Sequence, residues 1–205
     1  MKHPGKFIFS MVAILSLAFF SFHPSEPKVI NVVIDAGHGG HDEGSAAESV
    51  KEKEITAAFA SEIKRLNANN NVIIHFTRSG DDFVELTDRT NYINKIKPDL
   101  VISLHTASST DKQKSGVELY LYKNSLAYQA SIKLATKLRD KLVNKSNLKI
   151  NEINDASFMV LKNSNSPAIT VELGYLSNEQ DKAYLTNPND QERIARTILE
   201  FINEI

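Results

Sequence analysis

The chain has 205 residues, of which 41% are hydrophobic and 24% are charged, and this composition fits one ordinary globular domain with a real core. Its 24 lysines and arginines are balanced by 25 aspartates and glutamates, so the charge does not indicate a nucleic-acid-binding surface. The chain contains no cysteine, which excludes disulfides, thiol nucleophiles and thiolate metal sites. Any metal must therefore be bound by His, Asp or Glu.

The first 27 residues have the pattern of an export signal. Lys2, His3 and Lys6 make a basic start, and the apolar run that follows, residues 7–22, is shorter than the roughly 20 residues of a membrane-spanning helix. We therefore predict that residues 1–27 are a signal peptide and that the protein is exported, to the periplasm or the cell exterior. The alternative is an uncleaved N-terminal anchor, because no clear small-residue cleavage site is present. No membrane span is expected in the mature domain.

From Lys28 onward, patterns typical of strands and helices alternate. Strands are predicted at 29–34, 71–77, 99–104, 116–122 (an edge or antiparallel strand), near Phe158, and at 168–171. Helices are predicted at 52–66, 85–96, from 125 to about 144, and at the end of the chain. This alternation predicts an α/β fold: a single domain at 28–205, with a mostly parallel twisted sheet and helices on both faces.

Three side chains that can bind a metal or transfer a proton follow apolar runs predicted to be strands. They are His38 in VVIDAGHGGHDEGS, His105 in LVISLHTAS and Glu172 in AITVELGYLSN. Ligands of open α/β sheets bind at the carboxyl ends of the strands, so we expect the three side chains to converge at one edge. Two imidazoles and a carboxylate in one place indicate a zinc hydrolase.

Each of these residues also has an ordinary structural explanation when it is taken alone. His38 lies in a glycine-rich turn, where it is either free to reach a metal or simply a surface histidine. A phosphate-binding turn is disfavoured, because neither G-x-G-x-x-G nor a P-loop lysine is present. His105 alone is more simply a hydrogen-bonded histidine at a strand end. A carboxylate at Glu172 is costly to bury unless it is paired, hydrogen-bonded or used in chemistry, and a salt bridge is the alternative.

Catalytic zinc commonly has three protein ligands and leaves a fourth position for water, so a third ligand is expected. Glu52 is the candidate, because it begins a helix whose preceding loop leaves the His38 strand. A favourable interaction with the helix N-terminus is the simpler explanation for a lone acidic residue there. Glu172 differs in kind: it can accept a proton as the nucleophile forms and return it to a leaving amine.

Four ordered runs carry a family resemblance, at residues 35–40 (DAGHGG), 52–53 (EK), 103–107 (SLHTA) and 172–178 (ELGYLSN). They resemble Asp-Pro-Gly-His-Gly-Gly, Glu-Lys, Ser-Ile-His-Ala-Asn and Glu-Leu-Gly-Phe-Leu-Ser-Asn of the zinc-dependent N-acetylmuramoyl-L-alanine amidases of the type-3 amidase family. The similarity covers about Val29 to the C-terminus.

The resemblance implies what the chain binds and cleaves. It implies Zn²⁺ bound by His38, Glu52 and His105, with Glu172 as the catalytic carboxylate. The implied substrate is peptidoglycan, and the implied reaction is hydrolysis of the amide bond between N-acetylmuramic acid and the L-alanine of the stem peptide. Residues 28–205 are then the zinc amidase catalytic domain.

Three departures from the family pattern bear on the site. Ala36 replaces a proline, which loosens the turn without removing a ligand. Thr106 and Ala107 replace Ala-Asn, so a polar side chain expected beside the second histidine is missing. His41 adds an imidazole near His38, which we interpret as a solvated loop residue, with a metal contact as the alternative.

Two arginines in TRSGDDFVELTDR, Arg78 and Arg89, are expected to be structural and to connect loops to acidic partners. Some family members carry an inserted helix that blocks the site until a partner removes it. The region between 116–122 and Glu172 leaves little room for such a helix, so we predict activity without an activator protein. Another zinc hydrolase of cell-wall peptides and a non-catalytic peptidoglycan-binding protein remain alternatives.

Overall fold

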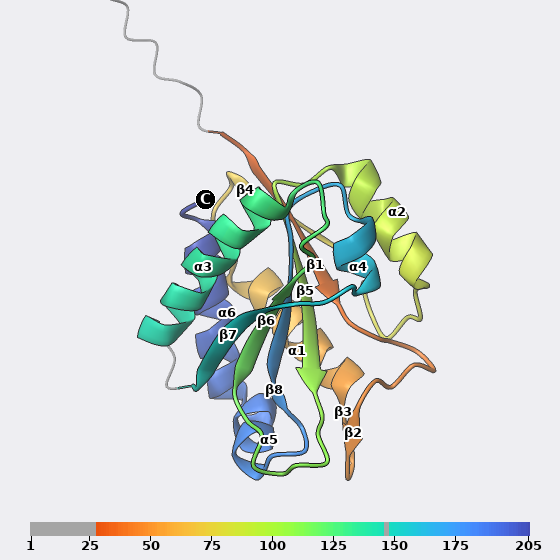
Figure 1. Cartoon of the computed structure of the whole chain (residues 1–205), viewed down its shortest axis with the longest axis vertical. Coiled ribbons are helices and arrows are strands. Elements are labelled where there is room, and N and C mark those ends of the chain that lie inside the picture. Colours follow the sequence, from red (N-terminus) through yellow and green to blue (C-terminus); the bar gives the residue numbers. More distant parts are fainter. Residues whose placement is uncertain (1–27, 146–147) are drawn as a thin grey trace, which may run out of the picture.

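The computed structural model describes residues 28–145 and 148–205, so the predicted signal or anchor at 1–27 lies outside the described residues. The strands are β1 (Ile30–Ala36), β2 (Ala46–Ala47), β3 (Val50–Lys51), β4 (Val72–Phe76), β5 (Leu100–Ala107), β6 (Val117–Leu121), β7 (Ile150–Asp155) and β8 (Ala168–Tyr175). The helices are α1 (Glu52–Leu66), α2 (Leu86–Ile96), α3 (Tyr128–Lys145), α4 (Met159–Asn163), α5 (Glu179–Thr186) and α6 (Pro188–Ile202). Figure 1 shows their arrangement.

Six strands form one sheet in the order β4-β1-β5-β8-β6-β7. Strands β4, β1, β5 and β8 are parallel, whereas β6 pairs antiparallel with β8 and parallel with β7. Strands β2 and β3 form a separate antiparallel pair in the loop between β1 and α1. The mostly parallel α/β sheet predicted from the sequence is therefore confirmed.

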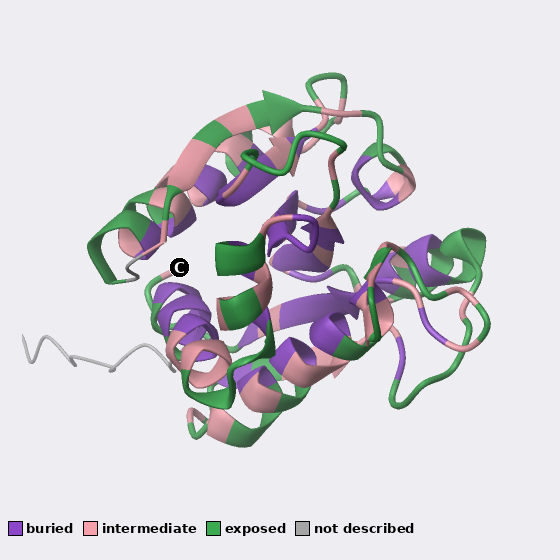
Figure 2. Cartoon of the chain, turned by 90° about the horizontal axis from the view of Figure 1, so that it is seen from below, coloured by how far each residue is buried: buried purple, intermediate pink, exposed green. Residues whose placement is uncertain are grey.

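Helices cover both faces of the sheet, as predicted. The larger core joins the sheet to α1, α3 and α6, with Phe59, Leu138 and Ile198 all fully buried in it. On the opposite face, Ile93 of α2 and Val160 of α4 pack in a smaller core. Figure 2 shows that the buried residues concentrate where helices meet the sheet.

Helix α1 matches its predicted bounds and shows why the pattern is informative. Ile55, Phe59 and Ile63 are spaced four residues apart and are all buried, which places them on the face toward the sheet. Acidic residues lie in the first turn and basic residues in the last turn, where each complements the helix dipole. Helix α1 therefore projects its first residue, Glu52, toward the carboxyl ends of β1 and β5.

Three local predictions were wrong in part. Strands β5 and β8 continue past the apolar runs to Ala107 and Tyr175, so His105 and Glu172 lie within strands and pair with each other in register. Phe158 is in no strand and immediately precedes α4, while the strand of that region is β7. The prediction of an edge or antiparallel strand at 116–122 is confirmed in its antiparallel form, since β6 pairs antiparallel with β8 and β7 pairs with its outer side.

The predicted closing helix is two helices. Helix α5 ends at Thr186, and the side chain of Asn187 accepts hydrogen bonds from the first backbone N–H groups of α6. Pro188 follows at the first position of α6, where its missing N–H costs nothing. None of the helices in residues 28–145 and 148–205 combines the length and the hydropathy needed to cross a bilayer.

Candidate metal centre and active site

The structure brings the three predicted metal ligands together. His38 comes from the turn after β1, Glu52 from the start of α1, and His105 from β5. One ligand atom from each lies within 4.8 Å of the others. Glu52 Oε1 is 3.1 Å from His38 Nε2 and 2.9 Å from His105 Nδ1, so one carboxylate oxygen stands between two imidazole nitrogens.

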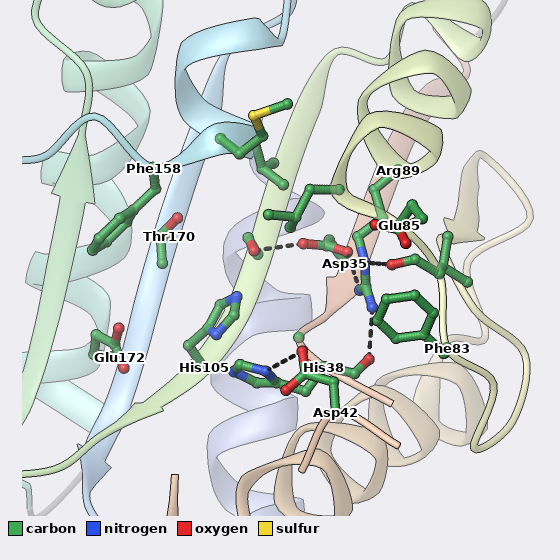
Figure 3. Close-up of a pocket in the computed structure, with 16 residues that line it drawn as sticks. Asp35, His38, Asp42, Phe83, Glu85, Arg89, His105, Phe158, Thr170 and Glu172 are labelled. Atoms are coloured by element: carbon green, nitrogen blue, oxygen red, sulfur yellow. Dashed lines mark hydrogen bonds and ion pairs between the residues drawn. The ribbon is translucent and has the colours of Figure 1, made fainter. Parts of the chain in front are cut away.

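The turn after β1 is shaped to present His38. Its φ of 61° lies in the left-handed region, which is uncommon for a residue with a side chain and is concentrated at functional sites. His38 Nδ1 lies 2.8 Å from Asp42 Oδ2, and this contact orients the ring so that Nε2 faces Glu52. Figure 3 shows His38 and Asp42 beside His105.

Gly37 provides the space that the second imidazole needs. A Cβ atom at this position would lie 2.7 Å from both ring nitrogens of His105, and still closer to the carbon between them. A side chain of any size would therefore displace the His105 ring. The glycine is required by close approach here, because the ring lies directly against the backbone.

Glu52 is buried and is held by several donors. Its Oε2 accepts hydrogen bonds from the backbone N–H of Ser45 at 2.8 Å and from the Ser45 hydroxyl at 3.0 Å. Its Oε1 accepts from the backbone N–H of Thr106 at 2.9 Å. Burial alone would raise the pKa of Glu52, but hydrogen bonds from His105 and His38 hold this pKa well below its usual range. Glu52 is therefore ionised, which is the form that a metal ligand requires.

Both imidazoles are tuned toward positive charge by this carboxylate. Burial opposes protonation of His38, but hydrogen bonds and charge from Glu52 and Asp42 raise its pKa to about 9. Burial likewise opposes protonation of His105, and Glu52 raises the pKa of that ring above its usual value. The site thus favours positive charge, and a divalent cation bound there would displace protons. Two imidazole nitrogens and one carboxylate oxygen are a donor set that suits zinc.

Glu172 lies on β8 directly opposite His105 in the sheet register. Burial raises the pKa of Glu172 to about 7, although the charge of His105 lowers it in part. Its Oε2 is buried and has no hydrogen-bond partner within the part of the chain that the structure describes. Since an unpaired buried carboxylate oxygen is costly, this side chain is a strong candidate for chemistry.

His38, His105 and Glu172 line one cavity of about 400 Å³, a size suited to a small ligand or part of a larger one. Its polar wall is formed by Asp35, His38, Asp42, Arg89, Ser103, His105, Thr170 and Glu172. Its apolar wall comes from the segment that leads into α2 and from the start of α4, with Phe83, Val84, Leu86, Phe158, Met159 and Val160. Figure 3 shows Phe158 near Thr170 and Glu172 on one side of the cavity, and Phe83 near Asp35 and Arg89 on the other.

Arg89 is structural, as predicted, and its acidic partner is Asp35. The Arg89 side chain donates to Asp35 Oδ1 at 2.8 Å and to the carbonyls of Ala36 and His38 at 2.7 and 2.6 Å. Burial opposes ionisation of Asp35, but Arg89 and two hydroxyl donors bring its pKa below the usual value. The pair therefore fixes the turn that carries His38. Sequence reasoning gave Asp35 no role, although it begins the DAGHGG motif.

Arg78 is also structural, but its contacts differ from the prediction. Its guanidinium donates mainly to backbone carbonyl oxygens, including Ala36 at 2.9 Å and Lys53 at 2.9 Å. These bonds connect the end of β1 to the first turn of α1. Arg78 therefore holds the elements that carry His38 and Glu52 at a constant separation.

The departures from the family pattern now have a place in the structure. The exposed ring of His41 packs 4.0 Å from the ring of Phe83 and is not in the described group of ligands. Thr106 is buried, and its hydroxyl lies 3.2 Å from the Ser45 hydroxyl, which itself donates to Glu52. Ser45 was missed by sequence reasoning, because a serine in a polar loop carries no distinguishing signal.

Comparison with known proteins decides the family. The Amidase_3 family, described as N-acetylmuramoyl-L-alanine amidase, matches residues 32–204. The chain belongs to this amidase family. A solved relative is the catalytic domain of CwlV, an N-acetylmuramoyl-L-alanine amidase from Bacillus (Paenibacillus) polymyxa var. colistinus, at 31% identity and a TM-score of 0.79; the match covers 85% of this chain and 97% of that one.

Curated relatives of this amidase family are longer than the matched region. A probable cell wall amidase, LytH of Staphylococcus saprophyticus, is 32% identical over 82% of this chain and 56% of its own length. The endolysin of Bacillus phage SPP1 is 32% identical over 85% of this chain and 65% of its own length. The chain therefore matches less than two thirds of the length of each of these two relatives. The family match confirms the resemblance seen in the sequence.

Proposed function

We propose that this member of the family is a zinc-dependent N-acetylmuramoyl-L-alanine amidase. It hydrolyses the amide bond between N-acetylmuramic acid and the L-alanine of peptidoglycan stem peptides. One observation carries the proposal: the ligand atoms of His38, Glu52 and His105 converge, and the two histidines line the same cavity as Glu172, whose buried Oε2 is unpaired in the described residues. The names of the relatives, a probable cell wall amidase and an endolysin, support a cell-wall substrate.

The residues present fit zinc, and His38, Glu52 and His105 would hold it. Bound zinc supplies a Lewis acid that polarises the scissile carbonyl and lowers the pKa of water toward about 7. Asp42 orients the His38 ring, while Ser45 and Thr106 hold the Glu52 carboxylate. These contacts keep the three ligand atoms close together before any metal binds.

Glu172 is the proton carrier in this proposal. Its carboxylate takes a proton from the attacking water and delivers it to the nitrogen of the leaving L-alanine. A pKa near 7 suits both steps, because the group then accepts and releases a proton at neutral pH. The buried Oε2 accepts no hydrogen bond from the described residues, so none of them stabilises the charged form of Glu172 through this oxygen.

Substrate access supports activity without an activator protein. The side chains of His38 and His105, two of the three proposed metal ligands, keep 23% and 25% of their surface exposed, so a substrate can approach them. We propose that residues 28–205 form the catalytic domain and that it acts outside the cytoplasm, in the periplasm or at the cell exterior. If the purified protein needs an added partner to cleave peptidoglycan, the part of the proposal that concerns the activator is wrong.

The test is mass spectrometry of the products after the protein is incubated with purified peptidoglycan. We expect free stem peptides that begin at L-alanine, lost when the metal is chelated and restored when zinc is added back. Bound zinc together with cleavage at another bond would indicate a different zinc hydrolase. Bound zinc without any cleavage would indicate a binding protein.

A further inference from the structure

The row of charged side chains at the metal site continues past Glu172. In the sheet register, His105 of β5 lies opposite Glu172 of β8, and Glu172 lies opposite Glu118 of the antiparallel β6. Glu118 is buried, at 7% exposure. Like charges directly opposite each other destabilise a sheet, so this pair of glutamates carries a local cost.

Glu118 has partners that offset this cost. The Tyr120 hydroxyl donates to Glu118 Oε2 at 2.6 Å, and the Tyr175 hydroxyl donates to the same carboxylate. Lys114 Nζ lies 3.9 Å from Glu118 Oε1 and 4.9 Å from the centre of the Tyr175 ring. The Tyr175 ring and the Glu118 carboxylate thus hold the Lys114 ammonium beside Glu118.

The Lys114 ammonium is available to a ligand. Its side chain is 51% exposed, although Glu118 and Tyr175 beneath it are buried. At 3.9 Å, the contact with Glu118 is longer than a hydrogen bond, so the carboxylate attracts the ammonium without accepting one of its hydrogens. The three donors of the ammonium can therefore serve an anionic group from outside.

The chemistry of the proposed function, on which this inference rests, sets the direction of the substrate. Glu172 returns its proton to the leaving nitrogen, so the first residue of the stem peptide lies next to Glu172. The scissile carbonyl lies toward the three metal ligands, on the β5 side, and the stem peptide therefore runs toward β6. Neighbouring strands are about 4.8 Å apart and one extended residue spans at most about 3.6 Å, so the second stem residue reaches the region of Lys114.

We propose that Lys114 binds a carboxylate on the second residue of the stem peptide and makes the enzyme prefer stems in which this group is free over stems in which it is amidated. Glu118 and Tyr175 are positioning residues for the ammonium. An amide carries no charge and gains little from an ammonium, so amidation at this place weakens the contact.

The experiment uses zinc-loaded protein and two muramoyl tripeptides that contain L-alanine, γ-linked D-glutamate and L-lysine. They differ only in the α-carboxyl of the glutamate, which is free in one and amidated in the other. We expect kcat/KM to favour the free carboxylate by roughly 5- to 10-fold, because the ammonium is half-exposed. Lys114→Gln should bring the ratio close to 1, mainly by raising KM for the free carboxylate.

Lys112→Gln is the matched control, because it removes the same charge from the same loop. It should keep the wild-type preference. If the wild type shows no preference, or if Lys114→Gln keeps it, the inference is wrong. If both variants weaken the preference equally, the effect is long-range charge and Lys114 is not a binding residue.

A binding measurement separates this inference from the proposed function. Calorimetry with the two free tripeptides needs no turnover. Tighter binding of the free carboxylate that disappears in Lys114→Gln supports the subsite even if the wild type cleaves neither muramoyl peptide, in which case the amidase proposal alone fails. Equal binding of the two tripeptides by the wild type overturns the subsite.

Discussion

At the scale of single residues, Glu172 can be separated from the metal ligands by its effect on turnover. Glu172→Gln keeps the shape of the side chain but removes its ability to accept a proton. We expect zinc content to stay normal and hydrolysis of peptidoglycan to fall by about 10²- to 10⁴-fold, the usual contribution of general acid–base catalysis. Metal analysis and the rate of stem-peptide release measure the two effects. Glu179→Gln, an exposed glutamate on α5, is the control, and near-normal rates in Glu172→Gln would move the proton carrier elsewhere.

A second prediction for a single residue concerns Gly37, which leaves space for the His105 ring. A methyl group at this position would overlap the His105 ring, so Gly37→Ala should displace that ligand. We expect the affinity for zinc to fall by roughly 10- to 100-fold, as when a contact that orients a metal ligand is lost. A competition titration with a chromophoric chelator measures this affinity. Gly80→Ala should leave it unchanged, because a Cβ there meets only the Asp82 carboxylate at 3.5 Å; equal affinities in the two variants would contradict the steric argument.

At the scale of elements, the pair of Asp35 on β1 and Arg89 on α2 joins the sheet to the helix across the site. Both side chains are at most 3% exposed, so removing one charge leaves the other buried without its ion-pair partner. Asp35→Asn should lower the free energy of unfolding by about 3–5 kcal/mol. Asp140→Asn breaks an exposed pair with Arg139 and should cost about 1 kcal/mol or less. Urea denaturation of both variants provides the comparison, and similar losses would show that the buried pair does not stabilise the fold.

The same pair makes stability depend on pH. The folded-state pKa of Asp35 is below its ordinary value of 3.8, so its contribution is fully present above that value and is lost as the pH falls through the folded-state pKa. The wild type should therefore lose stability more steeply below about pH 4 than Asp35→Asn does. Parallel acid-denaturation curves for the two proteins would be inconsistent with this linkage.

At the scale of the whole molecule, zinc should stabilise the fold, because its ligands come from the β1 turn, α1 and β5. Free zinc at 100 times its dissociation constant should add about 2.7 kcal/mol to the free energy of unfolding. For a domain of this size, that corresponds to a rise in Tm on the order of 5–10 °C. Differential scanning calorimetry with and without zinc measures this rise. His105→Ala should abolish it, and an unchanged Tm in the wild type would argue against a metal site.

Sequence alone was sufficient wherever the signal is local. The apolar runs that end in the glycine-rich turn, in His105 and in Glu172 are each continuous stretches of sequence. The four-residue spacing of Ile55, Phe59 and Ile63 likewise indicates one face of a helix. For this reason the bounds of α1 and the α/β class were predicted correctly, and the structure brings three of the four candidate site residues, His38, Glu52 and His105, together.

Tertiary structure decided whatever depends on pairing between distant segments. Strand β7 has a polar, half-exposed pattern and exists because β6 offers it a partner, so Phe158 was placed in the wrong element. The strands carrying His105 and Glu172 extend beyond their apolar runs because each pairs with the other. The placement of Glu118 beside Glu172 joins residues far apart in the chain, and the bond from Ser45 to Glu52 depends on the course of the loop before α1, so only the folded backbone sets both separations.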